Sequence, residues 1–168
     1  NFYKINNLNN IVMNYQLDEI DKKILDFLVE NTRMPFTEIA KQMDVSAGTI
    51  HVRVKKMEDA GIILGSSLNI DYGKLDYHFT AFIGILLTKS NRTQEVLKEL
   101  ASIPNVVEAS VISGKYNIFC KVRAKHTEDA KRIIYQIDDI QDVMRTESMI
   151  SMEEYLSDRN RLINAISI

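Results

Sequence analysis

Cysteine is nearly absent from this sequence: Cys120 is the only one among 168 residues. A single cysteine excludes an internal disulfide framework and suits a protein of the reducing cytoplasm. The chain also lacks any apolar run close to the ~20 residues that a membrane-spanning helix needs. Its first residues do not form the basic-then-apolar pattern of a secretory signal. We therefore expect a cytoplasmic protein with no membrane partner.

The chain also lacks a strong excess of either charge. Its 21 Lys and Arg residues against 23 Asp and Glu residues give a formal net charge of −2. So small a charge provides no overall attraction to nucleic acid, and any contact with DNA must come from a local patch. The hydrophobic content of 45% and the charged content of 26% are ordinary for a globular protein. A chain of this length holds one large domain or two small ones.

Residues that carry out chemistry are sparse as well. The three histidines, His51, His78 and His126, are scattered along the chain. No Ser/His/Asp set, metal-ligand spacing or glycine-rich phosphate loop is present. Cys120 lies within an apolar segment, where a buried structural thiol is the usual role. The sequence therefore predicts no catalytic residue, no metal and no cofactor.

The polar, Asn-rich segment NFYKINNLNNIV precedes Met13. Either Met13 is the natural start, so that residues 1–12 were added artificially or through a mis-assigned start codon, or these residues form a genuine disordered arm. In both cases we expect residues 1–16 to be a leader outside the folded domains.

Three short helices are predicted between residues 17 and 63, which we expect to form a helix-turn-helix domain. Residues 17–30 repeat apolar side chains at helical spacing, and Asp18 is the expected N-cap. The second helix begins near Pro35 or is capped by Thr37. A three-residue turn follows, in which Ser46 caps the third helix, and Gly61 ends that helix.

The third helix separates apolar from cationic side chains. Ile50, Val54 and Met57 lie within about 60° of one another on a helical wheel and should face the core. The segment 46–57 holds three cations and no acid, although residues 17–62 hold seven Lys and Arg against nine Asp and Glu. The short turn, the preceding helix and an exposed valine on the cationic face favour insertion into a DNA groove over a plain solvated helix face.

The expected DNA contacts follow from this helical wheel. Thr49 and Val52 would meet base edges, and Gly48 would allow close approach. Lys55, Lys56 and Arg53 would meet phosphates, although Arg53 lies at the boundary of the inner face and can extend along it. The full set is Ser46, Gly48, Thr49, Val52, Arg53, Lys55 and Lys56.

After an extended linker at 64–76, the pattern becomes β-α-β-β-α-β. The expected elements are a strand at 77–89, a helix at 90–103, strands at 106–113 and 117–124, a helix at 127–137 capped by Thr127, and a strand at 143–155. This order predicts a ferredoxin-like four-stranded antiparallel sheet with both helices on one face. The fold class is therefore α+β, an N-terminal helix-turn-helix (winged-helix-like) domain followed by a ferredoxin-like domain at 77–156.

The first strand of this sheet is apolar on both faces, so the face without helices also needs cover. A second copy of the sheet would provide it, and we therefore expect a homodimer through the C-terminal domain. Residues 157–168 should add a short helix.

From Tyr15 to the last expected strand, the chain resembles the Lrp/AsnC (feast/famine) family of prokaryotic transcription regulators. The resemblance is carried by LDEIDKKIL (17–25), by TEIAKQMDVSAGTIHVRVKKMEDAGII (37–63) and by the order of elements after the linker. It implies a DNA-binding domain and a C-terminal domain that dimerises and binds small molecules, commonly amino acids. It also implies assembly of dimers into larger discs, often octamers.

Two segments differ from the family pattern. The family often has a proline near the start of the recognition helix, whereas this chain has Ala47–Gly48, and glycine costs ~1 kcal/mol in a helix interior. The family's effector loop usually reads Gly-x-x-Asp, whereas this chain reads GKYN at 114–117. Asn117 keeps a carbonyl acceptor and loses the negative charge, which puts binding of a free amino acid in doubt. Lys115 either favours a more acidic effector or simply faces solvent.

The effector residues expected from this resemblance combine backbone N–H groups at a turn with side-chain acceptors near the subunit interface. They are Ser113, Gly114, Lys115, Tyr116 and Asn117, with Thr146 and Ser148 on the last strand. A plain hairpin turn is the alternative, and Tyr116 could equally belong to the core.

The leading hypothesis is therefore a sequence-specific regulator that binds double-stranded DNA and responds to a small-molecule effector at the C-terminal dimer interface. The alternative is an effector-binding or architectural protein that binds DNA with little sequence preference. The absence of a catalytic set argues against an enzyme.

Overall fold

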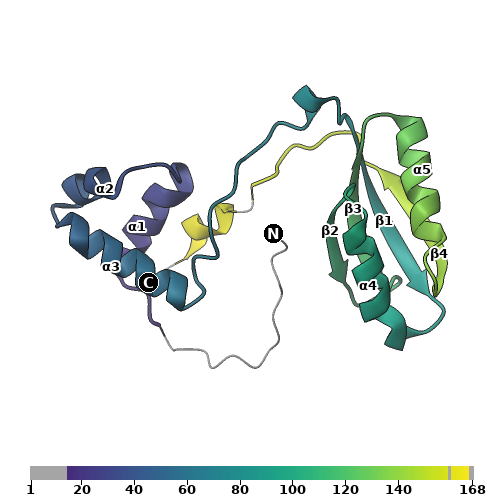
Figure 1. Cartoon of the computed structure of the whole chain (residues 1–168), viewed down its shortest axis with the longest axis horizontal. Helices are drawn as coiled ribbons and strands as arrows, with labels where there is room; N and C mark the ends of the chain where they lie inside the picture. Colours follow the sequence, from purple (N-terminus) through teal and green to yellow (C-terminus); the bar gives the residue numbers. More distant parts are fainter. Residues whose placement is uncertain (1–14, 159, 167–168) are drawn as a thin grey trace. The chain divides into compact units, whose positions relative to one another are not determined.

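The computed structural model describes residues 15–158 and 160–166 (Figure 1). The described residues form two compact units, one made of the chain up to Leu68 together with the segment from Ser157 onward, the other of Asn69–Leu156. The expected leader, including the suggested start at Met13, lies outside the described residues apart from Tyr15 and Gln16. No described helix has the length and apolar character needed to cross a membrane.

The first unit contains α1 (Glu19–Glu30), α2 (Phe36–Met43) and α3 (Ala47–Asp59). Asp18 caps α1 as predicted, because its carboxylate accepts a hydrogen bond from the Asp21 N–H at 2.9 Å. The Asp21 carboxylate in turn accepts from the Asp18 N–H at 3.2 Å, which completes a capping box. Pro35 occupies the N-cap of α2, so the alternative cap by Thr37 is wrong.

The core of this unit is formed by one face of each helix. Its buried apolar residues are Ile24, Leu25, Ile39, Ala40, Ile50, Val54 and Met57. Ile163 packs against this core from η3 (Arg161–Ala165), a short 3-10 helix near the other end of the chain. The helix expected at 157–168 is therefore a five-residue 3-10 segment, and it completes the core of the first unit.

The second unit is a four-stranded antiparallel sheet with the strand order β2-β3-β1-β4. In chain order its main elements are β1 (Phe79–Leu87), α4 (Thr93–Ser102), β2 (Val106–Val111), β3 (Ile118–Ala124), α5 (Thr127–Asp138) and β4 (Val143–Ile150). This confirms the predicted ferredoxin-like order. Several bounds differ from the expected ones. β1 is shorter at both ends, β2 ends at Val111, β4 ends at Ile150, and the 3-10 segment η2 (Ser90–Arg92) precedes α4. Another 3-10 segment, η1 (Gly73–Leu75), lies before β1.

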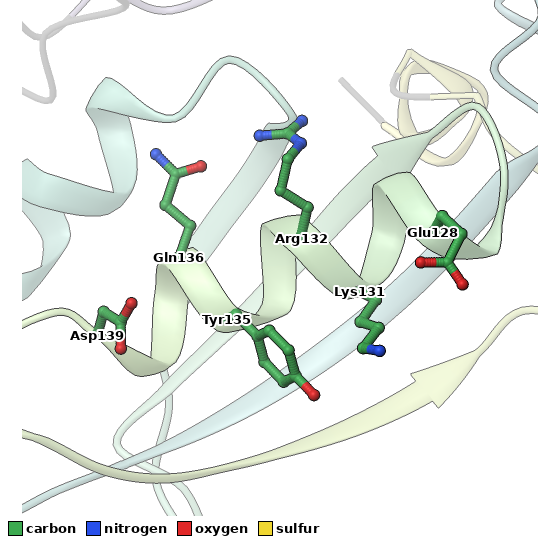
Figure 2. Close-up of a pocket in the computed structure, with 6 residues that line it drawn as sticks. All are labelled: Glu128, Lys131, Arg132, Tyr135, Gln136 and Asp139. Carbon is green, nitrogen blue, oxygen red and sulfur yellow. The ribbon is translucent and has the colours of Figure 1, made fainter.

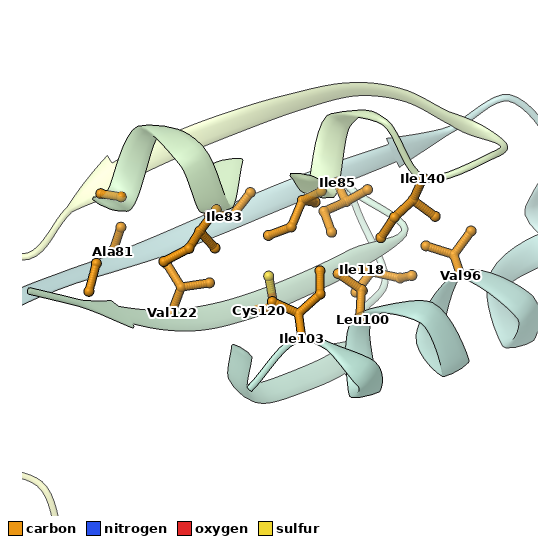
Figure 3. Packing of buried hydrophobic residues seen from close by; sticks show 14 of the residues in the cluster. Ala81, Ile83, Ile85, Val96, Leu100, Ile103, Ile118, Cys120, Val122 and Ile140 are labelled. Atoms are coloured by element: carbon orange, nitrogen blue, oxygen red, sulfur yellow. The ribbon is translucent and has the colours of Figure 1, made fainter. Parts of the chain in front are cut away.

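Both helices cover the same face of this sheet, as predicted. Alternate residues of β1 and β3 point into one core with Val96 and Leu100 of α4 (Figure 3). Ile133 and Ile137 of α5 belong to the same core. Cys120 lies in this core, where burial raises the pKa of its thiol to about 12. The thiol therefore stays protonated at neutral pH, in keeping with a structural role.

The opposite face of the sheet, which we call the open face, is covered by neither α4 nor α5. Phe82 and Phe119 stack there with ring centroids 5.9 Å apart. Glu154 follows β4 and forms ion pairs with Lys121 and with Arg123 on the same face. The open face thus combines an aromatic pair with charged groups that pair with one another.

The N-cap of α5 differs from the sequence expectation. His126, rather than Thr127, occupies the cap, and its Nδ1 accepts a hydrogen bond from the Asp129 N–H at 3.2 Å. Thr127 is the first residue of the helix. The expectation failed because histidine is an unusual cap, whereas threonine is a preferred one.

Replacing His126 by alanine should lower the free energy of unfolding by roughly 1 kcal/mol, since it removes this acceptor. His126→Asp restores an acceptor and should be at least as stable as the natural chain. Thr127→Ala is the matched control and should change stability little. Urea denaturation of the three variants measures this, and a larger loss in Thr127→Ala than in His126→Ala would contradict the assignment.

Candidate DNA interface and effector site

The outward face of α3 carries most of the predicted DNA contacts. Val52 is 54% exposed, while Ile50 and Met57 on the inner face are fully buried. Gly48, Lys55 and Lys56 are exposed along the same helix. A surface hollow of about 580 Å³ is lined by residues of α3 and of the start of α1, namely Tyr15, Gln16, Asp18, Asp21, Gly48, Thr49, Val52, Arg53 and Lys56. The helical wheel therefore separated the inner face from the exposed one correctly.

Ser46 and Thr49 form the start of this helix. The Ser46 hydroxyl accepts a hydrogen bond from the Thr49 N–H at 3.1 Å, and the two hydroxyl oxygens lie 2.8 Å apart. Ser46 is thus the N-cap that its position predicted. The Thr49 hydroxyl shares one hydrogen bond with the cap and keeps a lone pair directed away from it.

The two lysines of this face differ in their surroundings. Lys55 Nζ pairs with Asp59 Oδ1 at 2.8 Å, and the hydrogen bond that Lys55 donates to this carboxylate raises the pKa of Lys55. The pair is exposed, so the lysine can exchange this partner for another anion. Lys56 makes no ion pair with any residue that the structure describes, which leaves its charge available.

Arg53 lies apart from the other cations of the helix. Its Nη1 contacts Asp18 Oδ2 and Asp21 Oδ1, each at 2.8 Å, and Asp18 Oδ1 at 3.0 Å. Hydrogen bonds to Asp21 and Asp18 raise the pKa of Arg53. The pKa of Asp18 is lowered, first by the hydrogen bond from the Asp21 backbone and then by Arg53. The structure thus places this predicted phosphate contact against two carboxylates of its own unit.

The loop at 114–117 brings together a carboxylate, a phenol and an ammonium group. Lys115 Nζ lies 2.6 Å from Glu147 Oε2, and the Tyr116 hydroxyl donates to the same oxygen at 2.7 Å. These two bonds, in that order, lower the pKa of Glu147. Arg145 contacts the other carboxylate oxygen at 3.2 Å. Glu147 was not among the expected site residues.

Asn117 has a structural task at the edge of the sheet. Its Oδ1 accepts a hydrogen bond from the Leu87 N–H at 2.9 Å, and its Nδ2 donates to Ser90 Oγ at 3.3 Å. A register shift in the pairing with β4 occurs next to Leu87. The Asn117 carboxamide therefore closes the end of β1, and its acceptor is already occupied by backbone.

The structure does not bring all the predicted effector residues together. Thr146 and Ser148 lie opposite Ile85 and Ile83 and therefore on the helix-covered face, where Thr146 donates to Asp138 of α5 at 2.7 Å. Glu147 lies between them in β4 and points to the open face, opposite Gly84. Ser113 is an exposed turn residue. Strand alternation alone shows that Glu147 lies on the other face from its two neighbours, and the pairing with β1 decides which face that is.

A surface hollow of about 610 Å³ in the second unit lies elsewhere. It is lined by residues of the outward face of α5 and by the C-cap of that helix, namely Glu128, Lys131, Arg132, Tyr135, Gln136 and Asp139 (Figure 2). Side chains from a single helix border an open groove rather than an enclosed cavity, and none is a predicted effector residue. Among the described residues, no cluster of His, Cys, Asp and Glu side chains is arranged to hold a metal.

Comparison with known proteins identifies both units. Residues 17–58 match the AsnC-type helix-turn-helix domain, and residues 80–161 match the Lrp/AsnC ligand binding domain. The chain belongs to the Lrp/AsnC family. The regulatory protein AsnC of Haemophilus influenzae is 41% identical over 140 residues, which cover 83% of this chain and 93% of that protein. AsnC of Escherichia coli K12 is 38% identical over 141 residues, with the same coverage of both chains.

Solved structures agree with this assignment. The structure of Escherichia coli AsnC covers 85% of this chain and 97% of its own, with a TM-score of 0.81 and 36% identity. A Neisseria meningitidis transcriptional regulator in complex with L-Met has a TM-score of 0.81 and 20% identity, covering 86% of this chain and 96% of its own. The latter likeness shows the fold. The chain is thus a helix-turn-helix transcription regulator of the Lrp/AsnC family, whose relatives are regulators rather than enzymes.

In this member of the Lrp/AsnC family, the loop depends on one glycine of β1. A Cβ atom added at Gly84 would lie 2.7 Å from three ring atoms of Tyr116, which is far inside van der Waals contact. The Tyr116 ring therefore lies directly on the strand, and its hydroxyl reaches Glu147 from that position.

Replacing Gly84 by alanine should displace the Tyr116 ring and destabilise the second unit by roughly 1–3 kcal/mol. In a Tyr116→Ala background the same change should cost much less, because the obstructing ring is gone. Gly48→Ala is the control, since its nearest neighbour would be Ser46 Oγ at 3.7 Å. Urea denaturation measures all four chains, and equal costs in both backgrounds would show that Tyr116 is not the cause.

Proposed function

We propose that this chain is a sequence-specific, DNA-binding transcription regulator of the cytoplasm, controlled by a small-molecule effector, an amino acid or a related metabolite. The observation that carries this proposal is the outward face of α3. There Gly48, Val52 and Lys56 are exposed side by side, while the inner face of the helix is fully buried. Such a helix can enter the major groove without disturbing its own core.

Each residue of this face has a specific role in the proposed complex. The Val52 side chain meets a thymine methyl, and Gly48 lets the helix backbone approach the DNA closely. Lys56 binds phosphate directly, and Lys55 does so after exchanging Asp59 for it. Thr49 offers its hydroxyl to a base edge, and Ser46 fixes the start of the helix. These interactions are few, so one copy of α3 binds DNA weakly.

A homodimer supplies the second copy. We propose that two open faces pack together around Phe82 and Phe119, which remain partly exposed in the single chain. A two-fold interface of this kind presents two recognition helices to one operator. Dimers then assemble further, to octamers by analogy with the family.

The effector binds beside the dimer interface, at Lys115, Tyr116 and Glu147. The Glu147 carboxylate suits an ammonium group, and Lys115 suits a carboxylate, so the pair matches the two charged ends of an amino acid. Glu147 thus supplies the acid that Asn117 lacks, while Asn117 holds the loop in place. Effector control of DNA binding requires different effector affinities in the DNA-competent and incompetent assemblies.

Replacing Lys55 and Lys56 together by alanine should weaken binding to the chain's own promoter region. The slope of log K against log salt should also become shallower, by about 0.9 for every phosphate that the protein no longer neutralises. Gel-shift assays at several salt concentrations measure both quantities.

Lys98→Ala is the control, because it removes an exposed lysine of α4 outside the helical unit. It should leave the slope unchanged. An unaltered affinity and slope in the double variant would reject the groove contact. Equal affinity of the natural chain for promoter and random DNA would favour a regulator with little sequence preference.

Replacing Phe82 by aspartate should convert the dimer to a monomer, because the charge would be buried between two open faces. The affinity for the promoter should fall, and adding any of the standard amino acids should no longer change it. Light scattering coupled to size-exclusion chromatography measures the mass, with Tyr135→Asp as the control, since Tyr135 lies 57% exposed on α5. A dimer that persists in Phe82→Asp, or is absent in Tyr135→Asp, would place the interface elsewhere.

A further inference from the structure

We infer that Arg53 is a positioning residue, which fixes the orientation of α3 for DNA and does not bind phosphate. This inference rests on the proposed function, because it concerns the helix that is proposed to enter the groove. Arg53, the cation of α3 that faces inward, thereby has a role different from that of Lys55 and Lys56.

The first observation is the geometry of what we call the Arg53 cluster, formed by Tyr15, Asp18, Asp21 and Arg53. Arg53 Nη1 contacts both oxygens of Asp18 and one oxygen of Asp21, at 2.8 to 3.0 Å. The Tyr15 hydroxyl donates to the remaining Asp21 oxygen at 3.0 Å. Asp21 is only 1% exposed, so its charge depends on these partners.

The second observation is that the Arg53 cluster joins two helices. Asp18 and Asp21 form the capping box at the start of α1, and Arg53 lies on α3. Within residues 15–158 and 160–166, the bonds from Arg53 are the only side-chain hydrogen bonds between these elements. Apolar packing between the helices is not directional, whereas these bonds fix how α3 is rotated and tilted against α1.

The third observation is the charge of the cluster. One guanidinium and two carboxylates leave a net charge of −1, which repels phosphate. Half of the Asp18 side chain is exposed, at 52%, so this negative charge is not hidden from an approaching duplex. Arg53 is therefore poorly suited to the phosphate contact that its sequence position suggested.

Electrostatics and positioning predict opposite results when Asp21 is replaced by asparagine. Removal of a negative charge near the DNA should strengthen binding if charge alone matters. If Arg53 positions α3, the same change should weaken binding to the promoter, because the bonded partner of Arg53 is altered. Glu19→Gln removes an exposed charge in the same turn without touching Arg53, and it is the matched control.

The experiment compares Arg53→Met, Arg53→Lys, Asp21→Asn and Glu19→Gln in the full-length chain. Each is titrated with promoter and random duplexes at several salt concentrations, after circular dichroism and thermal melting establish the folded state. We expect Arg53→Met and Asp21→Asn each to lower promoter affinity by roughly tenfold. The variant that carries both Arg53→Met and Asp21→Asn should bind little more weakly than either single variant.

In Arg53→Met and in Asp21→Asn, the ratio of promoter affinity to random-duplex affinity should fall. The slope of log K against log salt should stay that of the natural chain. Arg53→Lys should recover part of the affinity, because lysine retains the charge without the planar fork. Glu19→Gln should bind as tightly as the natural chain or more tightly. If Arg53→Met or Asp21→Asn unfolds, Arg53→Lys and Asp18→Asn replace them, since asparagine keeps the cap acceptor and removes the charge.

A slope that becomes shallower by about 0.9 per helix in Arg53→Met, but not in Arg53→Lys, would identify a phosphate contact and overturn the inference. Tighter promoter binding by Asp21→Asn or Asp18→Asn would also overturn it. Failure of the proposed function would give a different result. The chain with Lys55 and Lys56 both replaced by alanine would then have the same salt slope as the natural chain, and the natural chain would bind promoter and random DNA equally. That result would overturn both proposals.

Discussion

The apolar character of β1 on both faces is the constraint on which the second unit depends. One face packs against α4 and α5 and forms the larger core of the chain. The other face holds Phe82 against Phe119 and carries Gly84, on which the Tyr116 ring lies. The loop that reaches Glu147 is thus placed by the same strand that leaves an aromatic surface uncovered. In the proposed dimer, effector loop and interface share one support, so a change at one can reach the other through β1.

The first unit depends on a different balance. Its net charge is acidic by count, so in the proposed complex α3 binds DNA through a few groups rather than through a general positive field. A recognition surface of this kind tolerates little misalignment, because every group that meets the DNA supplies a large share of the binding free energy. Capping by Ser46 and the ion pairs of Arg53 both act on the N-terminal half of α3, where the close-approach residue Gly48 lies. In the proposed complex, local charge therefore serves alignment as well as attraction.

Much of the fold was predictable from periodicity and capping residues, including the three helices, the caps at Asp18 and Ser46 and the βαββαβ order. The sites were less predictable, because they depend on pairings between distant residues. Arg53 meets acids 35 and 32 positions earlier, which no helical wheel reveals. In the sequence, Thr146 and Ser148 look as suitable as Glu147, because the register that sets the face of each residue appears only when β4 pairs with β1. The carboxamide of Asn117 looked available in the sequence and is held by Leu87 in the fold.

The first unit is discontinuous in sequence, since Ile163 of η3 packs against the core formed by the first three helices. The second unit is therefore an insertion between two parts of the first. During synthesis, α1, α2 and α3 leave the ribosome early, yet their core is completed only after residues 161–165 have been made. By then the whole sheet and both of its helices are available to fold. The order of translation thus places the sheet between the DNA-binding helices and the segment that completes their core.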